Sequence, residues 1–94
     1  MNTRAVAARV LLRIVEEGAY SNVVLPHATA DLHERDRSFV FRLVTDALRH
    51  DRLVTATIES AAKRKMAALD PEVRSVLQVA VAEIHDLRAT AVHR

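Results

Sequence analysis

The sequence predicts an all-α protein: a compact bundle of about five helices, built as one domain over residues 1–94. Three observations support this prediction. One glycine and two prolines are too few for the turns of a hairpin protein, and residues that favour helices are abundant. Apolar residues recur at helical spacing in several segments. A chain of 94 residues forms one small domain.

The segment from Glu34 to Leu53 has the clearest amphipathic pattern and is predicted to be the central helix. At about 100° per residue, its apolar side chains fill an arc of about 200°, which requires neighbours on two sides. These side chains are Phe39, Val40, Phe41, Leu43, Val44, Ala47 and Leu48. On the polar face Arg42 and Asp46 have the spacing of an i, i+4 ion pair, and Asp36 is the predicted N-cap.

Two helices are predicted before this segment. The first begins at a Thr3 cap and ends near Glu17, where Gly18 supplies the left-handed residue that commonly closes a helix. Pro26 would break an established helix, so a short second helix is expected to begin close to it and to end near His33.

Two more helices are predicted after it. One runs from Leu53 to Lys65, and a connector follows at 66–69. Its expected inward residues are Val54, Ile58, Ala61 and Ala62. The last helix is expected to begin at the sequence Asp-Pro-Glu of residues 70–72 and to run to about Leu87. Its expected buried seam is Val73, Val76, Leu77, Ala80, Ile84 and Leu87, with Val79 and Ala82 on the opposite side.

The composition excludes several classes of site. Without cysteine the chain has no disulfide, no thiolate zinc site and no cysteine nucleophile, which suits a reducing cytoplasm, and we expect a cytoplasmic location. Arginines at positions 4, 9 and 13 interrupt the first apolar run, so neither a signal peptide nor a membrane span is predicted. A net charge of +2 is too small to identify a nucleic-acid binder.

The order of these signals resembles the NusB-like RNA-binding fold, and most closely the domain at the amino terminus of the RsmB (Sun/Fmu) ribosomal RNA cytosine-C5 methyltransferases. The ordered D-R-x-F and L-D-P-x-V-R segments are its most specific features. The matching residues are Arg4, Ala8, Leu11, Leu12, Ser21, Asn22, Leu25, Arg35, Asp36, Arg37, Phe39, Leu43, Val44, Leu48, Arg49, Ile58, Leu69, Asp70, Val73, Arg74, Leu77 and Glu83. The chain departs from the family pattern at Asp46, Thr55, Gln78 and Ala82.

The resemblance implies an RNA-binding accessory module whose target is ribosomal RNA. The chain is also similar to the transcription antitermination factor NusB. The family has further helices that cover the third and fifth. We therefore expect a chain that lacks the family's last helices, either a short homologue or the amino-terminal part of a longer protein. A protein partner or a downstream catalytic domain is the implied neighbour of the uncovered faces.

No catalytic residue and no cofactor are predicted for this chain, so it is not expected to be an enzyme by itself. The implied methyltransferases need a glycine-rich cradle for S-adenosylmethionine and cysteines for covalent attack on cytosine, whereas this chain has one glycine and no cysteine. No metal site is predicted either. The chain has five histidines, one of them His93, and no two of them have the i, i+4 spacing that places two imidazoles on one metal ion.

Nucleic-acid binding is the function with local support in the sequence. Arginine and lysine neutralise phosphates, and they recur along the first helix, before the third and after the fourth. The candidate RNA-binding residues are Arg4, Arg9, Arg13, Arg37, Lys63, Arg64 and Lys65. Structural alternatives stay open: Arg13 can pair with Glu16 or Glu17, Arg37 can tie down its own loop, and a basic run is common at a helix carboxyl end.

A second hypothesis is a protein-interaction module that docks through exposed apolar sides of the third and fifth helices. Exposed apolar area of several hundred Å² marks such an interface. A DNA-binding helix-turn-helix is the third hypothesis. The apolar character of the central helix argues against it, because such a helix is too apolar to lie in a major groove.

Overall fold

The computed structural model describes residues 2–92, with side chains through residue 89, and every regular element in that part of the chain is helical. The prediction of an all-α bundle is confirmed. The elements are α1 (Thr3–Glu17), α2 (Ser21–Ala28), α3 (Glu34–Arg49), α4 (Asp51–Ala62), the 3₁₀ turn η1 (Met66–Ala68) and α5 (Pro71–Val92).

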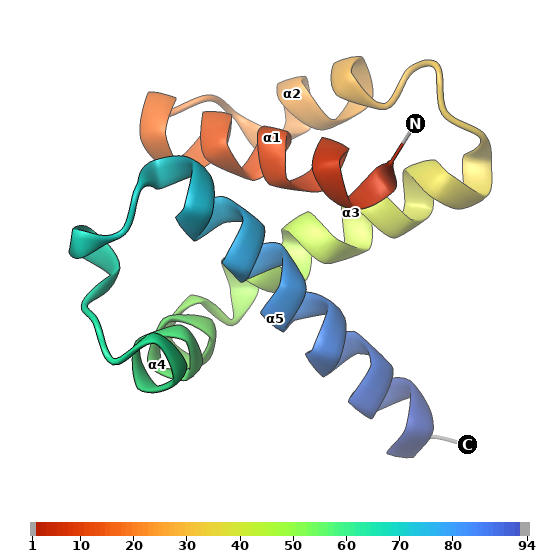
Figure 1. The fold of residues 1–94 in the computed structure, drawn as a ribbon. Helices are drawn as coiled ribbons and strands as arrows, with labels where there is room; N and C mark the ends of the chain where they lie inside the picture. Colours follow the sequence, from red (N-terminus) through yellow and green to blue (C-terminus); the bar gives the residue numbers. More distant parts are fainter. Residues whose placement is uncertain (1, 93–94) are drawn as a thin grey trace.

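Helices α1, α3 and α5 form the centre of the fold, and each contacts the other two. Figure 1 shows α1 and α5 crossing over α3 and α2 folded back along α1, with α4 at the lower left, where it packs against α5. The molecule is a flattened body of 37 × 37 × 21 Å. In this flat molecule α1 and α5 cover α3 on two sides, whereas one face of α5 is exposed to solvent.

The predicted role of α3 is confirmed. Val40, Leu43 and Val44 are 0% exposed because α1 and α5 cover the two flanks of its apolar arc. The arc is narrower than predicted, since Leu48 is 37% exposed and Phe39 is only half-buried. Both lie at the edges of the arc, where the neighbouring helices stop covering it.

The ends of α3 differ from the prediction. The helix begins at Glu34 and its N-cap position is His33, so the prediction of Asp36 as the cap is wrong. Asp36 lies in the first turn, where its carboxylate stabilises the positive end of the helix dipole. The predicted continuation to Leu53 is also wrong, because the chain turns at His50 and α4 begins at once.

Helix α1 has the predicted span, but its cap is Asn2. The side-chain oxygen of Asn2 accepts hydrogen bonds from the backbone N–H groups of Arg4 at 2.9 Å and Ala5 at 3.4 Å. Thr3, the predicted cap, is already the first helical residue. At the other end Gly18 has φ 71°, as predicted, and its N–H donates to the carbonyl of Arg13.

The prediction for α2 is wrong at both ends. The helix begins at Ser21 and ends at Ala28, with Pro26 inside it. Proline lacks one N–H, which leaves the carbonyl of Asn22 without its usual helical donor. A helix of eight residues tolerates this loss because Val24 and Leu25 are buried against the core and hold the turn in place.

In α4 only part of the predicted inner face is buried. Val54 and Ile58 are 1% and 3% exposed, as predicted, whereas Ala61 and Ala62 are exposed. The helix ends at Ala62, so the basic run that was predicted to finish it lies in the following turn. Lys63 closes the helix in the left-handed conformation, with φ 55°.

Helix α5 begins at Pro71 as predicted, but its backbone continues to Val92 instead of ending near Leu87, and its buried face is the opposite of the predicted one. The helix buries Ser75, Gln78, Val79 and Ala82. The larger aliphatic residues of the predicted seam point outward: Val73, Val76, Ile84 and Leu87 are 46–61% exposed. Val79 and Ala82 join the core formed with α1 and α3.

No helix in the described part of the chain is both long enough and apolar enough to cross a membrane.

Candidate nucleic-acid interface

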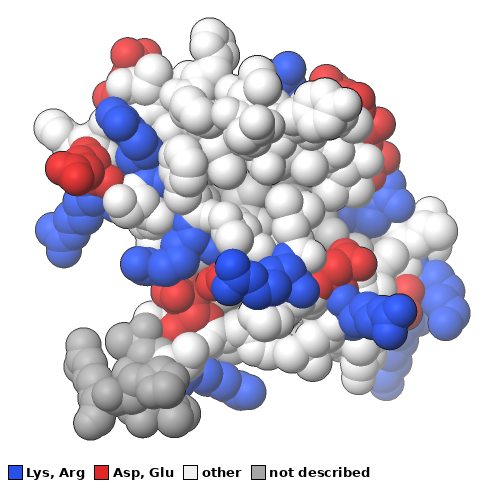
Figure 2. All heavy atoms as spheres, turned by 180° about the vertical axis from the view of Figure 1, so that it is seen from behind, with Lys and Arg blue, Asp and Glu red and all other residues white. Residues whose placement is uncertain are grey.

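Charged side chains of both signs are mixed over the rear of the molecule. Figure 2 shows Lys and Arg there in a band with Asp and Glu between them, below a broad uncharged region. Each neighbouring carboxylate weakens the field that a phosphate would meet. The cations that matter most for nucleic acid are therefore those without an acidic partner.

Arg4 joins the start of α1 to α5. Its Nε donates to a carboxylate oxygen of Glu83 at 2.7 Å, and an Nη donates to the other oxygen, so the pair is bidentate. The same guanidinium lies 5.4 Å from the ring centroid of Phe39. These hydrogen bonds lower the pKa of Glu83, an effect that its partial burial opposes.

Arg42 links α3 to α5, a contact that the sequence pattern did not indicate. It pairs with Asp86 of α5 at 3.1 Å, and not with Asp46 as its i, i+4 spacing predicted. Its guanidinium lies 5.7 Å from the Phe39 ring. Arg4 and Arg42 thus both hold the α1–α3–α5 junction, since Glu83 and Asp86 are one turn apart on α5.

A shallow depression opens at this junction, lined by residues from the starts of α1 and α3. Its lining residues are Thr3, Arg4, Arg35, Asp36, Ser38, Phe39 and Arg42. The lining contains three arginines and Asp36, and Glu83 and Asp86 of α5 pair with two of the arginines. The positive and negative charges at the depression therefore largely cancel. Of these arginines, only Arg35 makes no ion pair within the described chain.

The other predicted arginines have different surroundings. Arg13 pairs with Glu17 at 3.7 Å, one of the two alternatives open from the sequence. A terminal nitrogen of Arg37 lies 3.4 Å from the carbonyl oxygen of Leu32 and ties it to its own loop. Arg9 is exposed on α1, and the described residues offer it no ion-pair partner.

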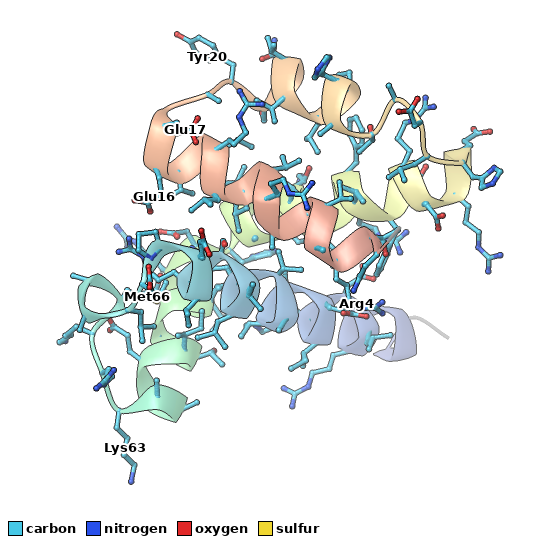
Figure 3. The ribbon with its side chains drawn as sticks, turned by 45° about the horizontal axis from the view of Figure 1, so that its top comes forward. Arg4, Glu16, Glu17, Tyr20, Lys63 and Met66 are labelled. Carbon is cyan, nitrogen blue, oxygen red and sulfur yellow. The ribbon has the colours of Figure 1, made fainter. Side chains whose placement is uncertain are left out.

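Lys63, Arg64 and Lys65 form the strongest local concentration of positive charge; we call them the basic loop. All three side chains are exposed, and no carboxylate of residues 2–89 pairs with them. The left-handed conformation of Lys63 turns the chain out of α4 at this point. Figure 3 shows Lys63 pointing away from the bundle, at the opposite end of the molecule from Arg4.

Contacts directly after the basic loop hold the end of its backbone in place. The backbone N–H of Met66, the next residue, donates to Glu59 of α4 at 2.8 Å. Nη1 of Arg74 lies 3.4 Å from the Met66 carbonyl oxygen, and its Nη2 donates to Glu16 of α1 at 3.2 Å. Three helices therefore fix the backbone just after the basic loop, while its charged side chains stay in solvent.

The sequence placed the basic loop at a helix end, and the contacts that fix it were missed. Glu16 and Arg74 are 58 residues apart, so no local spacing relates them. The available signal was a basic triplet at the end of an expected helix, ahead of a helix that begins at a proline.

Other chemistry finds little support in the described part of the chain. No group of three or more histidine, aspartate or glutamate side chains comes together there to hold a metal, and His93 lies outside it. Tyr20 is 77% exposed at the turn between α1 and α2, away from the basic loop (Figure 3).

In a comparison with protein-family models, the chain matches the NusB family over residues 1–93. Searches of curated proteins and of solved structures gave no significant match. The match covers nearly the whole chain and agrees with the all-helical architecture described above. The protein therefore belongs to the NusB family.

Proposed function

We propose that this chain is an RNA-binding module that helps to place ribosomal RNA for a cytosine-C5 methyltransferase. The observation that carries the proposal is membership of the NusB family over residues 1–93. The resemblance of its motifs to the amino-terminal domain of the RsmB enzymes supports the finer assignment. In this proposal the chain binds and positions RNA, and a separate catalytic domain supplies the chemistry.

The basic loop is the proposed main contact with the RNA backbone. Its three cations are exposed and free of carboxylate partners within the described residues, so their charge is available to phosphates. The contacts of Met66 with Glu59 and Arg74 fix the backbone where the loop ends, and a fixed backbone lowers the entropy lost on binding.

The arginines of α1 and α3 are proposed as secondary contacts. Arg9 is fully available on the surface of α1, whereas Arg4, Arg13 and Arg37 already have protein partners. A phosphate that reaches Arg4 has to share it with Glu83, so we expect a smaller contribution from this position.

The test is the salt dependence of affinity for a structured ribosomal RNA fragment, measured by fluorescence anisotropy. A basic-loop variant carries Lys63→Gln, Arg64→Gln and Lys65→Gln. The matched control carries Arg49→Gln, Arg52→Gln and Arg88→Gln, three exposed arginines elsewhere, and loses the same net charge.

We expect the natural chain to bind at low salt and the basic-loop variant to bind more weakly. The magnitude of its slope of log affinity against log salt should fall by about 2 to 3, since each of the three lost phosphate contacts removes about 0.7 to 0.9. The control should change much less. Absent binding at low salt contradicts the proposal, and equal losses in the two variants contradict the role of the basic loop.

A further inference from the structure

Glu59 lies beside the basic loop without pairing with it. Together with Lys63, Arg64 and Lys65 it lines a shallow depression of about 250 Å³ at the carboxyl end of α4. Glu59 is half-buried, whereas the three cations are exposed, and among the described side chains none of them forms an ion pair with its carboxylate. The depression therefore presents one carboxylate and three cations to a ligand.

A backbone contact holds the Glu59 side chain in position. Its Oε2 accepts a hydrogen bond from the backbone N–H of Met66 at 2.8 Å. Its Oε1 accepts no hydrogen bond from residues 2–89. Because an ionised carboxylate only accepts hydrogen bonds, a ligand has to bring N–H or O–H donors to this oxygen.

A ligand of the depression has to suit charges of both signs. Anionic groups suit the three cations, and N–H donors suit the carboxylate of Glu59. A nucleotide offers both, because its phosphate is anionic and its base edge carries N–H groups. In a double helix that edge is already paired, so the matching ligand is an unpaired nucleotide, the form in which proteins recognise RNA sequence.

Guanine is the base whose hydrogen-bonding groups fit the depression best. Its N1–H and its N2 amino group are adjacent donors, so both can point at one carboxylate. Adenine and cytosine place a ring acceptor next to the amino group, and uracil has one N–H between two carbonyls, so in each case an acceptor faces the carboxylate. Guanine O6 and N7 accept together from an arginine fork, and Arg64 is an arginine of the depression.

We propose that the depression between Glu59 and the basic loop is a subsite for an unpaired guanosine of the bound RNA. Glu59 accepts from N1–H and the N2 amino group, Arg64 donates to O6 and N7, and Lys63 and Lys65 meet the neighbouring phosphates. Figure 3 shows Lys63 pointing away from the bundle, where an RNA backbone can pass. This subsite rests on the proposed function and adds a base preference to it, which phosphate contacts alone do not provide.

The test compares short single-stranded RNAs that differ in one base, by fluorescence anisotropy at a fixed low salt concentration. One labelled probe is an oligouridylate of about seven nucleotides, a second has guanosine at its centre, and a third has inosine there, which lacks the N2 amino group. We expect the guanosine probe to bind about tenfold more tightly than the uridine probe. The inosine probe should fall between them.

Glu59→Gln separates base recognition from charge. The glutamine oxygen can still accept from the Met66 N–H, but its NH₂ group then meets the donors of guanine. The variant should lose the preference for guanosine and bind the uridine probe at least as tightly as the natural chain, because a negative charge near the phosphates is gone. Glu34→Gln, an exposed position at the start of α3, loses the same charge and should keep the preference.

A second measurement uses only the natural chain. Because the Met66 amide donates to Glu59, its chemical shift reports on a ligand at that carboxylate. Guanosine 5′-monophosphate added to the isotope-labelled chain should move this resonance, and uridine 5′-monophosphate should move it much less.

The outcomes separate this subsite from the proposed function. Equal affinities for the guanosine and uridine probes, a preference that survives Glu59→Gln, or equal Met66 shifts with the two nucleotides would overturn the subsite. Binding of the structured ribosomal RNA fragment without binding of either probe would overturn it too, and RNA binding would stand. A chain that binds none of these RNAs would contradict the proposed function as well.

Discussion

Arg74 contacts two other elements at once. Its guanidinium, about one fifth exposed, donates to Glu16 of α1 and lies near the carbonyl of Met66, and its Nε is buried without a partner. A side chain so placed is difficult to replace, because its removal leaves Glu16 and Met66 with fewer donors.

We therefore expect Arg74→Met to lower the free energy of unfolding by about 1 to 3 kcal/mol in urea denaturation. Arg88→Met is the control, since Arg88 is exposed on the same helix, and its effect should stay within about 0.5 kcal/mol. Similar losses in both variants would show that the contacts of Arg74 do not stabilise the fold.

The ion pair between Glu83 and Arg4 makes stability depend on pH. Because hydrogen bonds from Arg4 hold the pKa of Glu83 below its ordinary value of 4.5, the folded chain binds this proton less readily than the unfolded chain. The contribution to stability is fully present above about pH 4.5 and is lost as the pH falls through the lowered pKa.

Glu83→Gln should accordingly lower the free energy of unfolding by up to about 1 kcal/mol at pH 7, a modest effect because the side chain of Arg4 is 56% exposed. The gap between variant and natural chain should close as the pH falls below 4.5. Thermal melts across this range check it, with Asp31→Asn, an exposed loop residue, as control. A gap that is constant with pH would contradict the assignment.

At the scale of helices, capping is where the sequence pattern and the structure differ most. Asn2 and Thr3 are both good capping residues, and their order alone does not say which one caps α1. The structure assigns the role to Asn2 through its two hydrogen bonds to backbone N–H groups.

Asn2→Ala should lower the free energy of unfolding by about 1 kcal/mol, because these N–H groups lose their acceptor. Thr3→Ala should leave it nearly unchanged, since Thr3 is inside the helix. Chemical denaturation of the two variants checks the difference, and a larger loss for Thr3→Ala would contradict the assigned cap.

Much of the fold could be predicted from local patterns, and the failures have a common cause. The core positions of α3 followed from apolar spacing, and the carboxyl end of α1 followed from Gly18. The buried face of α5 was predicted wrongly, because periodicity identifies the apolar face of a helix but not which neighbour covers it. The pairs of Arg4 with Glu83 and of Arg42 with Asp86 depend on the same tertiary arrangement, so local spacing could not reveal them.

The molecule as a whole has one core around α3 and one exposed apolar face on α5. Leu43 is 0% exposed in that core, whereas Leu87 is 61% exposed on the outer face of α5. The same substitution at these two positions therefore has very different expected consequences for the monomer.

Leu43→Ala should lower the free energy of unfolding by about 3 kcal/mol or more, as expected for a buried leucine, out of a total of about 5 to 15 kcal/mol. Leu87→Ala, measured at a concentration where the chain is monomeric, should change it by less than about 0.5 kcal/mol. Equal losses in urea denaturation would mean that α5 packs within the monomer differently from the described arrangement.

The most direct test of the proposed RNA-binding role is an amide chemical-shift titration of the isotope-labelled chain with a structured ribosomal RNA fragment. We expect the largest shifts at Lys63–Lys65 and their immediate neighbours, with smaller ones near Arg9, and we expect added salt to reverse them. Shifts that are absent at low salt, or that concentrate on the exposed face of α5 while the basic loop stays unperturbed, would contradict this role.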